Sequence, residues 1–273
     1  MKCTANGYVQ PVEDTILASM KLKRLFSAIL MAAAVPVIVA QQPELVVAGS
    51  ISLSAASDGF DGRLELLEDS RLSPALKKAL WESGGPEMAL DPKDPLYKDL
   101  ASIPLRNATL RLRDAHGKVV AEKTLEREMA RIGFVSLHPG WRTILVTTDL
   151  SAGFGSYSGP DTELLEVSGA ELESVVARDS ESGSSEPIRL ASTLKTAWKL
   201  VPAPGGENGQ KDILEFACHP ADWGSMKSDF VLIYTRYHWD GKGWVEFNRR
   251  VHGFWESDEG FPPSARFPGA TAN

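Results

Sequence analysis

The chain has 273 residues, a formal net charge of −7 at pH 7 and 24% charged residues. Acidic residues outnumber basic ones, and no long block of basic residues interrupts the sequence. This balance disfavours nucleic acid, or an anionic membrane surface, as the main partner. Nucleic-acid-binding proteins are therefore the first class that the composition sets aside.

Residues 20–40 have the organisation of a secretory signal peptide. Lys21, Lys23 and Arg24 form a basic start, and a charge-free apolar run over 25–40 follows and ends in small residues. This run is shorter than the roughly 20 residues that a membrane-spanning helix needs. The pattern predicts a periplasmic or secreted protein that keeps no permanent membrane anchor after signal cleavage.

Residues 1–19 precede this basic start, although Met20 followed by Lys-Leu-Lys-Arg has the form of a natural initiation point. We therefore interpret residues 1–19 as a candidate upstream extension that is not native to the exported protein. Cleavage after Ala40 would also remove Cys3 and leave Cys218 as the single cysteine. A single cysteine predicts no internal disulfide, and free cysteines are most often buried as small hydrophobic residues.

Residues 41–103 are expected to form a small N-terminal segment with one strand and one helix. The apolar run 44–53 predicts the strand. Ser73 supplies a helix N-cap and a proline follows at the first helical position; leucines then recur at helical spacing, which predicts a short helix over 74–82. Prolines repeated over 86–104 predict a connector with little regular structure.

Residues 104–256 have the pattern of a main antiparallel β domain, followed by a flexible tail over 257–273 that is rich in proline. Short apolar runs alternate with turn signals in this part of the chain. The expected strands are 108–113, 119–125, 132–137, 142–148, 162–167, 171–177, 194–201 and 212–218, followed by a long hairpin over 230–251. The fold class is therefore mainly β, an antiparallel meander that forms a sandwich, a barrel or a propeller-like domain.

The glycine-rich turn 153–160 resembles three motifs and matches none of them. A phosphate-binding G-x-G-x-x-G turn leads into a helix, whereas the β-like run 162–167 follows here. A nucleophile elbow needs a serine where Tyr157 stands. Asp149 and Asp161 offer oxygen ligands for calcium, but their spacing lacks the calcium-loop pattern. We expect a wide hairpin connection with no required cofactor, with Tyr157 as a candidate binding residue and Asp149 and Asp161 as a candidate calcium pair.

The hairpin 230–251 carries aromatic residues close to its Asp-Gly tip. Tyr237, Trp239 and Trp244 are named as candidate binding residues, because exposed rings on a sheet can stack on sugar rings or on a partner's aliphatic groups. The alternative is that the same rings fill the core of a sheet protein that has no disulfide.

The sequence contains no recognisable catalytic motif. It favours an exported β protein that acts as a binding or interaction module in the cell envelope or outside the cell, with an envelope protein or glycan as partner. A hydrolase of envelope polymers that uses carboxylates, and a calcium-dependent propeller-like adhesion module, are the alternatives, because catalytic groups can be neighbours in space without forming a motif.

Overall fold

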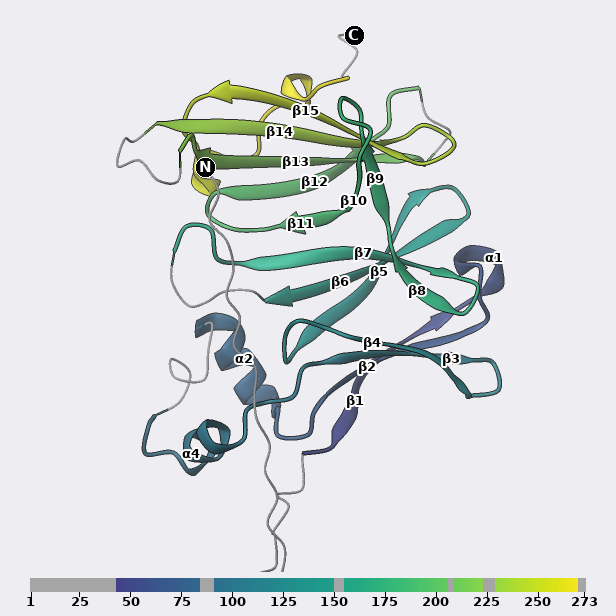
Figure 1. The fold of residues 1–273 in the computed structure, drawn as a ribbon, viewed down its shortest axis with the longest axis vertical. Coiled ribbons are helices and arrows are strands. Elements are labelled where there is room, and N and C mark those ends of the chain that lie inside the picture. The colour runs from purple at the N-terminus through teal and green to yellow at the C-terminus, as the bar shows by residue number, and fades with distance from the viewer. Residues whose placement is uncertain (1–42, 84–90, 150–154, 206–208, 223–228, 270–273) are drawn as a thin grey trace, which may run out of the picture. The chain divides into compact units, whose positions relative to one another are not determined.

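The computed structural model describes residues 43–83, 91–149, 155–205, 209–222 and 229–269 of the chain. All of these residues belong to one compact structural unit, Gln42–Asn273. The described part is mainly β, as the short apolar runs and turn signals predicted, and its strands form three sheets (Figure 1). Every pairing between described strands is antiparallel except the pairing of β9 (Val176–Asp179) with β15 (Trp244–His252), which is parallel.

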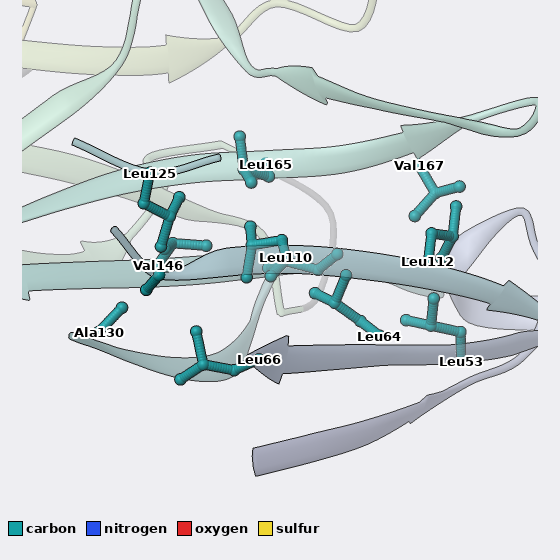
Figure 2. Packing of buried hydrophobic residues seen from close by; sticks show 12 residues of the cluster. Leu53, Leu64, Leu66, Leu110, Leu112, Leu125, Ala130, Val146, Leu165 and Val167 are labelled. Carbon is teal, nitrogen blue, oxygen red and sulfur yellow. The ribbon is translucent and has the colours of Figure 1, made fainter. Parts of the chain in front are cut away.

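The first sheet has the strand order β1-β2-β3-β4 and joins strands from both sides of the proline-rich connector. Its strands are β1 (Leu45–Leu53), β2 (Gly62–Asp69), β3 (Thr109–Asp114) and β4 (Val119–Thr124). Leu64 and Leu110 lie on the face of this sheet that meets the next one, and both are completely buried (Figure 2).

The middle sheet has the order β11-β7-β6-β5, and β8 pairs with β7 beside this path. Its strands are β5 (Ala130–His138), β6 (Trp141–Asp149), β7 (Pro160–Ser168), β8 (Glu171–Ser174) and β11 (Arg189–Ala191). Ile144 and Leu165 pack against the first sheet, whereas Leu145 and Leu164 pack on the opposite side. Burial of both faces explains why the centre of β6, Ile144 to Val146, is apolar at consecutive positions.

The third sheet packs on that opposite side and has the order β10-β9-β15-β14-β13-β12. Its strands are β9 (Val176–Asp179), β10 (Ser185–Pro187), β12 (Thr196–Pro202), β13 (Lys211–Pro220), β14 (Phe230–Trp239) and β15 (Trp244–His252). Stacked sheets with interdigitating inner faces make a sandwich, which decides between the three architectures that the sequence left open.

Two bends carry the chain between the middle and third sheets. The chain passes from β8 to β9 through Val175 and from β10 to β11 through Ile188. Val175 N donates to Leu164 O at 2.9 Å, and Ile188 N donates to Val175 O at 2.8 Å. Because these backbone hydrogen bonds continue through the bends, the two sheets are held together by main chain as well as by side-chain packing.

The described residues include three α-helices, α1 (Ala55–Asp58), α2 (Pro74–Ser83) and α4 (Pro95–Ser102). Helix α2 confirms the predicted helix, with Leu76 and Leu80 buried. The expectation of a single helix, with little regular structure over 86–104, is wrong because α4 lies in that segment. Pro95 occupies the first position of α4, where its fixed φ suits the helix, and Leu100 anchors α4 in the same cluster as α2.

The described part of the C-terminal segment packs against the outer face of the third sheet, although its prolines had suggested a flexible tail. It contains two single-turn 3-10 helices, η1 (Ser257–Glu259) and η2 (Ser264–Arg266). Phe267 is 2% exposed and packs with Trp255 and Cys218. The free thiol of Cys218 is buried in this cluster, which confirms the interpretation of this residue as a small hydrophobe.

Candidate functional site

Two of the predicted binding residues, Tyr237 and Trp244, are in the core. Their exposed fractions are 7% and 5%, and both pack in the hydrophobic cluster between the middle and third sheets. They lie on the face of β14 and β15 that the middle sheet covers. Neither ring is therefore available to stack on a ligand, and the core alternative holds for both.

Trp239, the last residue of β14, is partly exposed and belongs to a row of rings. Its ring stacks on His138 of β5, with centroids 5.1 Å apart and planes inclined by 21°. His138 in turn stacks on Trp141 at 6.2 Å, and Trp244 meets Trp239 edge-on at 5.8 Å. Four rings from four strands therefore support one another at one end of the sandwich, which limits the rotamers that each can adopt.

A polar cleft of about 450 Å³ lies beside this row, and we call it the aromatic cleft. Its lining includes the polar and aromatic residues His138, Gln210, His238, Trp239 and Asp240, together with Pro139 and Pro204. Gln210 Nε2 donates to Trp239 O at 3.0 Å, and Asp240 Oδ1 accepts two backbone N–H bonds within the hairpin tip. The cleft is thus built at strand ends and turns that are tied to each other by hydrogen bonds.

A buried carboxylate orients His238 at the edge of the aromatic cleft. Asp212 is completely buried; its Oδ1 lies 2.8 Å from His238 Nδ1, and its Oδ2 accepts from Arg236 Nε at 2.7 Å. With Nδ1 engaged, Nε2 is the ring nitrogen left to a ligand. Burial lowers the pKa of His138, so that ring is neutral at pH 7.

Sequence reasoning missed Asp212, Arg236 and His238. The signal was present, because Arg236 and His238 are two residues apart on one strand and therefore share a face. What the sequence does not show is that β13 pairs with β14 in the register that places an aspartate opposite them.

Tyr157 lies elsewhere in the molecule. Its ring stacks on His219 near the far end of β13, with centroids 5.6 Å apart and planes inclined by 8°. The register places Trp239 beside the start of β13, so about 25 Å of strand separates the two sites. The structure therefore does not bring Tyr157 and Trp239 into one site.

Asp161 lines a small cleft of about 90 Å³ together with Glu163, Lys123 and Arg189. Burial raises the pKa of Asp161. Burial also opposes ionisation of Glu163, but hydrogen bonds from Lys123 and Ser174 outweigh it and lower the pKa of that carboxyl. The two neighbouring carboxyls are thus shifted in opposite directions.

One member of the candidate calcium pair, the side chain of Asp149, lies outside the part of the chain that the structure describes. Among the side chains that the structure does describe, no group of three or more His, Cys, Asp or Glu could hold a metal ion. Likewise, no helix of the described ranges is long and apolar enough to cross a membrane.

No protein-family model, no curated protein and no solved structure matches this chain. The class to which the protein belongs is therefore defined by its own fold and clefts. It is an antiparallel β sandwich of three sheets with an aromatic cleft at one end.

Proposed function

We propose that the protein is an exported carbohydrate-binding module that takes neutral sugar rings of an envelope glycan in the aromatic cleft. The observation that carries the proposal is the partly exposed ring of Trp239, stacked on His138 at the wall of a polar cleft. An aromatic ring offers a flat apolar surface to the C–H face of a sugar, and the hydroxyls around that sugar need polar partners.

The polar groups of the aromatic cleft suit such a ligand. Gln210, His238 and Asp240 are polar residues among those that line the cleft. A volume of about 450 Å³ is within the range of small-molecule sites. The net charge of −7 favours neutral sugars over polyanionic ones, because like charges repel.

Replacement of Trp239 with alanine is expected to weaken glycan binding at least tenfold, because truncation of an aromatic hot-spot residue costs about 2 kcal/mol or more. Residues 41–273 are incubated with insoluble envelope glycans, and the fraction retained is measured. Trp198→Ala is the matched control, since Trp198 is also partly buried against the same hydrophobic cluster but does not line the cleft. Equal retention of both variants and the wild type, or capture of an envelope protein without glycan, contradicts the proposal.

Export is the second part of the proposal and is supported by the signal-like segment 20–40. A fold that buries its free Cys218 and uses no disulfide between described residues needs no oxidation after export. N-terminal sequencing of the protein from its native source is expected to begin near Gln41. A mature chain that still carries Lys2 would contradict both the cleavage and the interpretation of residues 1–19.

Glycan hydrolysis is a second candidate function, and one observation favours it. Asp161 and Glu163 lie two residues apart on one face of β7, and the shifts of their pKa values are opposite. Glycoside hydrolysis uses two carboxyls whose surroundings shift their pKa values apart. Release of reducing ends from the glycan, at a rate that falls at least a hundredfold in Asp161→Asn, would support hydrolysis. An unchanged rate in that variant would exclude hydrolysis by this pair.

A further inference from the structure

The face of the third sheet that packs on the middle sheet continues beyond that contact. In the register of β13, β14 and β15, His219 lies opposite Val231, and Val231 lies opposite His252. In the neighbouring row, Ile233 lies opposite Arg250. Partners in register share a face of a sheet, so these side chains lie on one surface.

This surface forms a cleft of about 540 Å³, which we call the cationic cleft. Val231 and Ile233 of the central strand β14 form its apolar floor, and His219 on one side and Arg250 and His252 on the other form its walls. The outer strands β13 and β15 are two strand spacings apart, about 9–10 Å. That width accommodates one flat ring or one tetrahedral oxyanion between the walls.

The charge of the cationic cleft is opposite to that of the protein. None of its described lining residues is acidic, although the chain has 36 acidic and 29 basic residues. Arg250 forms no ion pair with another described residue. At the exposed rim, His252 Nδ1 lies 3.4 Å from Asp229 Oδ1. Burial and the neighbouring Arg250 lower the pKa of His219, so the fixed positive charge inside the cleft at pH 7 is that of Arg250.

We propose that the cationic cleft binds a small anion, a phosphate monoester or a carboxylate, that is attached to an apolar body. The guanidinium of Arg250 presents paired N–H donors that match two oxygens of such an anion. The apolar body lies over Val231 and Ile233, and His219, on whose ring Tyr157 stacks, stands at one side.

The test is isothermal titration of residues 41–273 at low ionic strength with phenyl phosphate, inorganic phosphate and phenol as probes. Phenyl phosphate is expected to bind more tightly than inorganic phosphate, and phenol is expected not to bind measurably. Arg250→Gln is expected to weaken phenyl phosphate binding at least tenfold. Addition of 0.5 M salt should weaken it too, because an exposed charge is screened.

Arg249→Gln is the matched control. Arg249 is the adjacent residue of β15 and is also exposed; it faces the other side of the sheet, where its Nη1 donates to Arg266 O at 3.4 Å. The Arg249→Gln substitution removes the same charge from the protein as Arg250→Gln but from the other face, so phenyl phosphate binding within twofold of the wild type is expected. Equal weakening of phenyl phosphate binding by both variants would show a net-charge effect only. Equal affinity for phenyl phosphate and inorganic phosphate would show that an apolar body contributes nothing to binding. Either result, or no binding at all, overturns the proposal.

Discussion

Replacement of Glu215 with glutamine is expected to raise the free energy of unfolding at pH 8 by about 2–3 kcal/mol, and to leave it unchanged at pH 4. Glu215 lies on β13 and faces the middle sheet, where Ala191 N donates to its Oε1 at 3.3 Å and Tyr237 Oη donates to its Oε2 at 3.4 Å. Burial, with smaller contributions from Asp161 and Glu246, raises the pKa of Glu215 to about 7. Glutamine has the shape and the acceptor of the protonated acid and cannot ionise.

The direction follows from proton linkage. Between the ordinary carboxyl pKa of 4.5 and about 7, folded Glu215 holds a proton that the unfolded chain has released. The contribution of this group to stability is therefore complete at low pH, falls as the pH rises through this window, and is lost above pH 7.

Urea unfolding of both proteins at several pH values measures the difference, and Glu186→Gln at an exposed position of β10 is the control. If the free energy of unfolding of the Glu215→Gln variant differs from that of the wild type by the same amount at pH 4 and pH 8, the fold does not hold the carboxyl protonated.

Leu164→Ala and Leu165→Ala are each expected to lower the free energy of unfolding by about 2–5 kcal/mol. These adjacent residues of β7 are 1% and 0% exposed, and they point to opposite sides of the middle sheet. Each substitution leaves a cavity in a different core. A sheet with one face in water would make only one of the two substitutions costly.

The control for this pair is Leu194→Ala, because Leu194 is 56% exposed and its replacement is expected to cost less than about 0.5 kcal/mol. Thermal or urea unfolding of the three variants gives the comparison. A cost near that of the control for either Leu164 or Leu165 would contradict the three-layer arrangement.

The strands could be predicted from the sequence because alternation, β-branched residues and turn signals are local properties. The hairpin 230–251 is an example, with Asp240 at its tip in the expected place. Repeated prolines do not predict helix α4, because proline interrupts a helix interior, yet at the first helical position it is a good starting residue.

The site could be predicted only in part, because it depends on which sheet covers which face. Trp239 and Trp244 flank the same hairpin tip, yet only Trp244 is fully packed against the middle sheet. The two rings have different tertiary neighbours: Trp239 stacks on His138 of β5, about 100 residues earlier in the chain, whereas Trp244 is buried in the cluster between the middle and third sheets. Asp212 and His238 meet through strand register, which local sequence does not specify.

The most direct test of the account is the set of indole N–H signals in an NMR spectrum of residues 41–273, assigned by single Trp→Phe variants. On addition of an oligosaccharide from a glycan that retains the protein, the signal of Trp239 is expected to shift in proportion to occupancy. That of Trp255, which is buried in the cluster on the outer face of the third sheet, should stay within line width. A bound ligand that leaves the Trp239 signal unmoved would contradict binding at the aromatic cleft.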